Sequence, residues 1–186
     1  MSQFIRKHNF KTISLFICCL FALFSCRKNS ETSDDSVIRV GQEYGGGIIF
    51  YVDGSGQHGL IASTRDLSVK TKWADSCCKT NAIYTGIGRG IDNTSAIVSA
   101  QGAGDYAASL CSQLVLQGYS DWFLPSKNEL NLLYQQRDFV GGFSTDYYWS
   151  SSEHDSIRAW YLYFPYGPQY YTKKDSAARV RPIRAF

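Results

Sequence analysis

Short apolar runs separated by Gly-rich or polar turns make up most of this chain. Residues 48–52 and 59–62 are two apolar runs around the Gly-rich segment 53–58, a pattern that predicts a β-hairpin. Strand patterning returns at residues 147–152, 157–164 and 170–172. Residues 178–186 close the chain as a further strand, and Pro182 indicates an edge position or the end of that strand because proline has no N–H to donate.

Helical spacing is found in two segments. Apolar residues recur every three or four positions in residues 105–117, before Gly118. A second helix is expected after Ser126, because Ser126 and Glu129 have the spacing of a capping box. Residues 65–102 are polar, Gly-rich and weakly periodic, which predicts a long irregular loop. Strands in the majority with two helices indicate an α+β fold.

The first residues differ from the rest. They carry three basic and no acidic side chains, followed by an apolar run and then Cys26, which is the order of a signal peptide. Leu23 and Ser25 before Cys26 resemble the lipobox of bacterial lipoproteins, in which the cysteine is acylated and becomes the first mature residue. The alternatives are an ordinary secretory signal and a membrane-spanning anchor, but a run of about thirteen apolar residues is too short to span a bilayer.

Three segments follow from this interpretation. Residues 1–25 are predicted to be the signal peptide and Cys26 the lipidation site. Residues 26–37 contain no large apolar side chain before Val37, so we expect them to form a flexible tether. Residues 38–186 are the predicted folded domain, long enough to bury a core without metal.

Removing the signal peptide also removes the net charge. The whole chain is +3, from 19 basic and 16 acidic residues, and the signal holds three of the basic ones. A mature chain with 16 of each sign is a poor candidate for binding nucleic acid, which usually requires a basic surface. A local basic cluster remains near the C-terminus: Lys173, Lys174, Arg179, Arg181 and Arg184.

Three of the six cysteines remain after the signal peptide and Cys26 are set aside. In an oxidising compartment we expect a disulfide from Cys111 to either Cys77 or Cys78. Zinc is the alternative, but no C-x-x-C pair exists and only His58 and His154 lie outside the signal. We therefore predict no metal and no cofactor. Calcium binding lacks the required ligand spacing at the three acids that would offer it: Asp53, Asp92 and Asp121.

Catalysis is not predicted. Ser150, Ser151 and Ser152 precede Glu153, His154 and Asp155, which are the residue types of a hydrolase triad. Adjacent residues on an extended strand point in alternate directions, so these side chains cannot meet as nucleophile, base and orienting acid.

Aromatic residues concentrate between residues 147 and 171. We expect Trp149 and Trp160 to lie in the core. The tyrosines in and beside the Pro-Tyr-Gly-Pro turn at residues 165–168 are expected to be exposed, where they could stack on sugar rings or on a partner protein. The predicted ligand-binding residues are Tyr166, Tyr170, Tyr171, Lys173, Arg179 and Arg181. The cations would hold acidic groups of a polysaccharide, and the alternative is that they pair with acids of neighbouring loops.

Four blocks carry a family resemblance: D-W-F-L-P-S-K-N-E-L at 121–130, Y-W-S-S-S-E at 148–153, A-W-Y-L-Y-F at 159–164 and A-R-V-R-P-I-R-A-F at 178–186. Over about residues 40–186 the chain resembles the C-terminal domain of the Legionella collagen-like adhesin (Lcl), a domain of unknown function. The resemblance implies a C-type-lectin-like fold, related to formylglycine-generating enzymes, in which two helices flank a twisted antiparallel sheet with long loops.

Together these features predict a lipid-anchored protein of the bacterial cell envelope, placed in the outer membrane. The expected partners are the membrane, through the anchor, and an extracellular glycan such as an acidic polysaccharide. The alternative is a subunit that packs against another envelope protein, because exposed aromatic loops suit either partner.

Overall fold

The computed structural model describes residues 37–75 and 79–186. The predicted signal peptide, Cys26, the tether before residue 37, Cys77 and Cys78 lie outside the described residues. The first half contains β1 (Glu43–Tyr44), β2 (Gly47–Val52), β3 (Gly59–Ala62), β4 (Ser68–Lys72), α1 (Gly90–Gln101) and α2 (Ala107–Ser112). The second half contains α3 (Lys127–Gln135), α4 (Arg137–Val140), β5 (Tyr147–Glu153), β6 (Arg158–Tyr163), β7 (Gln169–Lys173), β8 (Ala177–Val180) and β9 (Ile183–Ala185).

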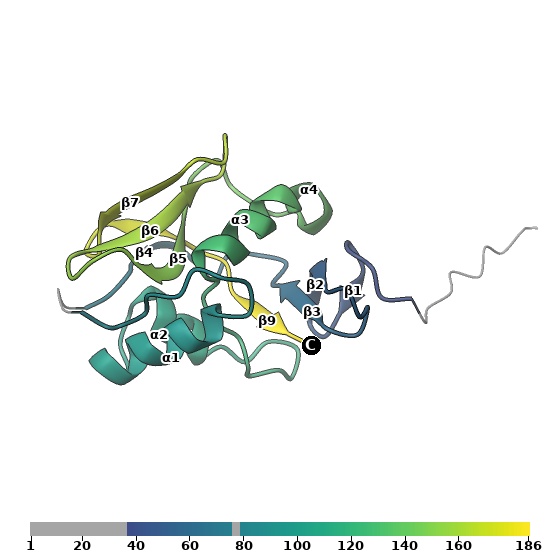
Figure 1. Ribbon diagram of the computed structural model, residues 1–186, viewed down its shortest axis with the longest axis horizontal. Helices are drawn as coiled ribbons and strands as arrows, with labels where there is room; N and C mark the ends of the chain where they lie inside the picture. The colour runs from purple at the N-terminus through teal and green to yellow at the C-terminus, as the bar shows by residue number, and fades with distance from the viewer. Residues whose placement is uncertain (1–36, 76–78) are drawn as a thin grey trace, which may run out of the picture. The chain divides into compact units, whose positions relative to one another are not determined.

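Two sheets form the framework (Figure 1). The first has the order β1-β2-β3-β9 and is antiparallel, and it includes the predicted hairpin as β2 and β3. The second has the order β4-β8-β5-β6-β7, in which only the β5–β8 pair is parallel. The α+β prediction is confirmed. The expected two helices are four in the described residues, and the expected single sheet is two.

The last strand of the sequence prediction is divided between the two sheets. β8 lies inside the second sheet, and β9 is an edge strand of the first. The break falls at Arg181 and Pro182, where proline cannot donate to a strand partner. The prediction that Pro182 marks the end of a strand is therefore confirmed, whereas a single strand over residues 178–186 was wrong.

The predicted loop at residues 65–102 is also partly wrong, because it contains β4 and the twelve-residue helix α1. The buried positions of α1 are Gly90, Asn93, Thr94 and Ile97, which have the i, i+3, i+4, i+7 spacing of one helix face. Three of these four are not large apolar residues, so hydrophobic periodicity did not reveal the helix.

The two predicted helices differ in outcome. α3 begins after Ser126, whose side chain accepts from the Glu129 N–H while Glu129 caps the Ser126 N–H, so the capping box is confirmed. α2 is shorter than predicted. It ends at Ser112, and Val115, expected on its apolar stripe, is 69% exposed.

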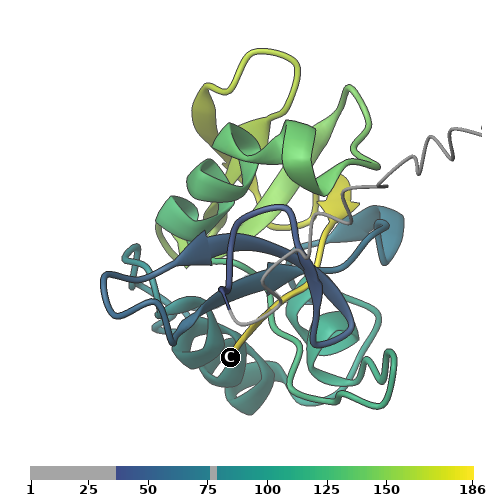
Figure 2. The same cartoon turned by 90° about the vertical axis from the view of Figure 1, so that its right-hand side faces the viewer.

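Core residues lie on both faces of the second sheet. Trp149 of β5 packs with Trp73, Ile97 and the start of α2, whereas its neighbour Tyr148 packs with α3 and the first sheet. Figures 1 and 2 both show α3 and α4 in the upper half of the view and α1 and α2 in the lower half. No helix in the described part of the chain is long and apolar enough to cross a membrane.

Candidate functional site

The β6–β7 hairpin carries most of the predicted binding residues. β7 is an edge strand of the second sheet and pairs with β6 from Arg158↔Lys173 to Leu162↔Gln169. The three tyrosines predicted to be exposed are exposed: Tyr166 by 80%, Tyr170 by 49% and Tyr171 by 44%. Alternation along the strands then decides which of them share a face.

Five tyrosines form a continuous row on one face, which we call the tyrosine row: Tyr166, Tyr163, Tyr147, Tyr161 and Tyr170. Successive ring centroids in this order are 5.7, 4.5, 4.7 and 6.4 Å apart. The row continues into the core, because the Tyr161 ring lies 5.6 Å from that of buried Trp149. Strand β5 and the β6–β7 hairpin therefore present one continuous aromatic surface, and this surface is anchored in the core.

Strand register produces the row. Tyr147 is opposite Tyr163 across β5 and β6, and Tyr161 is opposite Tyr170 across β6 and β7, where side chains on one face of paired strands meet. The Tyr147 ring stacks on that of Tyr163 at an interplanar angle of 29° and is tilted by 36° to that of Tyr161. The inner rings cover each other's faces, so the row offers hydroxyl groups in its middle and more open ring faces at Tyr166 and Tyr170.

The tyrosine row is uncharged. Burial and the neighbouring Tyr147 and Tyr170 raise the pKa of Tyr161, so its hydroxyl stays protonated and can both donate and accept hydrogen bonds at neutral pH. No cation lies over a ring of the row among the described contacts. This face therefore offers aromatic ring surface and hydroxyl groups rather than charge.

The opposite face of the hairpin has a different chemistry. Tyr171 stacks on His154 with centroids 3.9 Å apart and meets Trp160 edge-on at 5.3 Å. The Lys127 Nζ atom at the start of α3 lies 3.4 Å from the Trp160 ring centroid. Trp160 is half-buried, so its assignment to the core was wrong. Trp160 lies next to the edge strand β7, and Lys127 covers only part of its ring.

Arg158 adds charge to this second face, but the charge is compensated. Its Nε and Nη2 atoms lie 2.7 and 2.6 Å from Asp155 Oδ2, which is also 2.9 Å from His154 Nδ1. Arg158 and then His154 hold the pKa of Asp155 far below its usual range. Lys127 and Lys173 make no ion pair with any described residue, so the second face is weakly cationic.

Apart from Lys173, the residues of the basic cluster near the C-terminus form ion pairs within the protein. Arg181 is 1% exposed, with Nη2 2.7 Å from Asp66 Oδ1, and Arg179 contacts Asp66 and Asp146 at 3.1 Å. These two were predicted to bind ligand, and in the structure their charges pair with loop acids, which was the alternative. Two further pairs use the rest of the cluster: Lys174 with Glu153 and Arg184 with Asp121.

The serine run is internal as well. Ser150, Ser151 and Ser152 are fully buried. The Ser150 hydroxyl donates to the Trp160 carbonyl at 2.9 Å, and the Ser152 hydroxyl donates to the Tyr84 carbonyl at 2.7 Å. These side chains join strands and loops, and they are not presented to a substrate.

Cys111 is fully buried and forms no disulfide with another described residue, and burial strongly raises the pKa of its thiol. Its predicted partners, Cys77 and Cys78, fall outside the described residues, so the disulfide remains a prediction. Within the described ranges no group of three His, Cys, Asp or Glu side chains is placed to hold a metal. Asp53 bonds to Ser55 in its own turn, where this contact lowers the Asp53 pKa.

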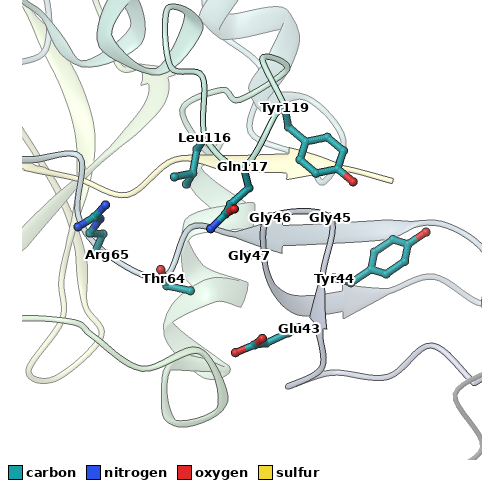
Figure 3. Close-up of a pocket in the computed structure, with 10 residues that line it drawn as sticks. All are labelled: Glu43, Tyr44, Gly45, Gly46, Gly47, Thr64, Arg65, Leu116, Gln117 and Tyr119. Atoms are coloured by element: carbon teal, nitrogen blue, oxygen red, sulfur yellow. The ribbon is translucent and has the colours of Figure 1, made fainter.

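A groove that the sequence did not indicate lies at one end of the first sheet (Figure 3). It has a volume of about 600 Å³ and lies between the β1–β2 turn, residues 64–65 after β3, and residues 116–119. Gly45, Gly46 and Gly47 line the groove at the first of these turns. The second turn, at Gln117-Gly118, was not among the features predicted from the sequence. Neither turn indicates a groove by itself, because two turns enclose a cavity only when the fold brings them together.

Comparison with known proteins identifies the domain. Residues 62–184, about two thirds of the chain, match the family described as Lcl C-terminal domain. The chain belongs to this family. No curated protein matches it. The matched part of the Lcl C-terminal domain includes the whole β6–β7 hairpin and the tyrosine row, whereas β1 and β2, which form one wall of the groove, precede it.

Proposed function

We propose that this protein is lipid-anchored in the bacterial cell envelope and that its Lcl C-terminal domain binds an extracellular polysaccharide without catalysis. The anchor is proposed from the lipobox-like residues before Cys26, and the outer membrane is the proposed location. A C-type-lectin-like fold is proposed from the family resemblance, in keeping with mixed sheets, few helices and long connections.

The tyrosine row is the observation that carries this proposal. Tyrosine offers a large apolar face with a polar end and only two side-chain torsions to immobilise, which makes it an efficient contact residue. The row places five such side chains side by side, and its end members Tyr166 and Tyr170 are exposed. Repeated rings with hydroxyls between them suit a ligand of repeated sugar rings.

The absence of charge from the row favours an uncharged polysaccharide over an acidic one. An acidic ligand would be drawn to the opposite face, where Lys127 and Lys173 are unpaired within the described structure and Trp160 and Tyr171 supply aromatic surface. Of the cations first assigned to an acidic ligand, only Lys173 is exposed. Acidic polysaccharide is therefore the second candidate, and it would bind the second face.

Adjacent tyrosines of β7 provide a matched test. Tyr170 and Tyr171 have similar exposure but lie on opposite faces. Binding to an array of uncharged and acidic polysaccharides is measured for the protein and for Tyr170→Ala and Tyr171→Ala. We expect Tyr170→Ala to weaken binding about tenfold, equivalent to about 1.4 kcal/mol, while Tyr171→Ala has little effect. Binding should be insensitive to salt, since no charge pairs are formed.

Other outcomes assign the function elsewhere. Loss of binding only in Tyr171→Ala, with binding that falls as salt rises, would establish the acidic ligand on the second face. An array without any bound glycan, together with a co-purifying envelope protein, would contradict the polysaccharide proposal and favour the protein-interaction alternative. The anchor is tested separately with Cys26→Ala, which should no longer partition into membranes.

A further inference from the structure

The groove is enclosed by two tight turns that touch each other. Gly45 and Gly46 have φ of 54° and 86°, and Gln117 and Gly118 have φ of 53° and 82°. Each pair connects two hydrogen-bonded residues, as in a type I′ turn. A Cβ atom on Gly46 would lie 3.1 Å from the Gln117 Cβ and 3.0 Å from Tyr119 Cδ2. Contact this close fixes the separation of the two turns.

Arg184 contacts both of these turns. Its Nη1 donates to the Gly45 carbonyl at 3.0 Å, and its guanidinium lies 3.9 Å from the Tyr119 ring centroid. Two further bonds of 2.7 and 2.8 Å join it to Asp121. Tyr44, on the first turn, packs edge-on against Phe186 at 5.3 Å. The walls of the groove are therefore preorganised, which reduces the entropic cost of binding.

Gln117 occupies an unfavourable backbone conformation at the groove. A positive φ costs a residue with a side chain about 1–2 kcal/mol, and Gly, Asn and Asp are the usual residues at this turn position. Such strain often occurs at ligand sites, where the side chain has a role of its own. Figure 3 shows the Gln117 amide on the groove between the two walls, where it can bond a polar ligand.

The groove also carries one charge of each sign. Glu43 comes from β1, and Arg65 follows β3 (Figure 3). Both are exposed, and neither forms an ion pair with another residue of the described structure. They line the same groove without forming an ion pair with each other. An anionic ligand would satisfy Arg65 and be repelled by Glu43, whereas a ligand with a separated cation and anion complements both.

We propose that the groove binds a zwitterionic ligand of the amino-acid and short-peptide class. Arg65 pairs with its carboxylate, Glu43 pairs with its ammonium group, and the Gln117 amide bonds the peptide group between them. Tyr44, Tyr119 and Leu116 supply apolar contact for a side chain. This site is separate from the tyrosine row and does not depend on the polysaccharide proposal.

The test uses four forms of the dipeptide Ala-Leu: unmodified, N-acetylated, C-amidated and modified at both ends. Their binding to the full-length protein in detergent is measured by titration calorimetry. We expect the unmodified form to bind most tightly and each single modification to weaken binding about fivefold, as for one exposed ion pair. Arg65→Gln should weaken the unmodified form about fivefold and leave the amidated form unchanged. Glu43→Gln should behave in the same way toward the acetylated form.

Two variants control for position and for folding. Lys173→Gln removes an exposed cation from the β6–β7 hairpin and should not change dipeptide binding. Gln117→Gly relieves the positive φ, so we expect a melting temperature that is unchanged or higher together with weaker binding. Equal binding of all four dipeptide forms, or no saturable binding in the millimolar range, would overturn the proposal. Unchanged binding in Gln117→Gly would overturn the role of that amide.

Discussion

Arg181 gives the sharpest stability test, because its guanidinium is fully used inside the protein. Nε and Nη2 bond Asp66, Nη1 donates to the carbonyls of Ser63 and Gly141, and Nη2 also donates to Gly142 at 2.5 Å. Arg181→Ala would leave three carbonyls without these donors and Asp66 with only Arg179 and the Tyr148 hydroxyl as partners. Removing one partner of a buried pair costs about 3–5 kcal/mol, a large part of the 5–15 kcal/mol typical of a domain.

Urea unfolding measures this loss. With a slope of about 2 kcal/mol per molar urea, a loss of about 4 kcal/mol lowers the midpoint by about 2 M. Lys173→Ala is the matched control, since an exposed and unpaired cation should cost less than about 0.5 kcal/mol. Arg181→Lys keeps the charge but has three donors in place of five, so we expect an intermediate midpoint.

A double-mutant cycle with Asp66→Ala tests the cause. If the cost arises from a stranded partner, the double variant will lose clearly less free energy of unfolding than the sum of the two single variants. A midpoint within about 0.5 M of the original for Arg181→Ala, which is about 1 kcal/mol, would refute the reasoning. So would loss of glycan binding at unchanged stability, which would return Arg181 to the binding site.

The further predictions concern three titratable groups: Glu129, Asp121 and Cys111. Glu129 is buried and accepts hydrogen bonds from the N–H groups of Ser126 and Gly88 at 2.6 and 2.7 Å. In Glu129→Gln the side-chain NH₂ would face one of these N–H donors, so urea unfolding should show a loss of about 1–3 kcal/mol. An unchanged midpoint would contradict this. Burial raises the Glu129 pKa above its ordinary 4.5, so the folded state binds more protons than the unfolded state. Stability should therefore fall as pH rises from 4.5 through the folded pKa of Glu129. This dependence of stability on pH should vanish in Glu129→Gln. The pH dependence due to Asp121 has the opposite sign, because its ion pair with a guanidinium lowers its pKa below 3.8. The stability that Asp121 contributes is present above that pH and is lost as pH falls through its folded pKa. Asp121→Asn should therefore flatten the acid limb of the curve of stability against pH. Cys111 should resist alkylation in the reduced, folded protein and react once urea unfolds it, as followed by peptide mass spectrometry; rapid labelling of the folded protein would show that this thiol is accessible.

Features governed by neighbouring residues were predictable. The capping box at Ser126 depends on one turn of chain, and the β2–β3 hairpin depends on a Gly-rich connection between two apolar runs. Exposure of Tyr166 follows from its place in the Pro-Tyr-Gly-Pro turn at residues 165–168. In each case the residues that determine the structure lie within a few positions of one another.

α1 could not be found in this way, because its buried face is polar. The Asn93 side chain bonds both the carbonyl and the N–H of Tyr84, at 2.6 and 3.1 Å, and the Thr94 hydroxyl donates to the Gly90 carbonyl at 2.8 Å. Burial of a polar side chain is tolerated when its hydrogen bonds are satisfied. For Asn93 the partner is a loop residue whose position depends on the tertiary fold.

By itself the sequence determined which side chains of the β6–β7 hairpin share a face, since alternation is a property of the extended backbone. Only the tertiary structure decided which cations remain available to a ligand. Arg181 finds Asp66 across 115 positions of the chain, and Arg184 finds Asp121 across 63. Lys173 meets no such acid in the described structure. The free energy of a charge depends on its burial and on the partner that folding brings to it, and neither is a property of the local sequence.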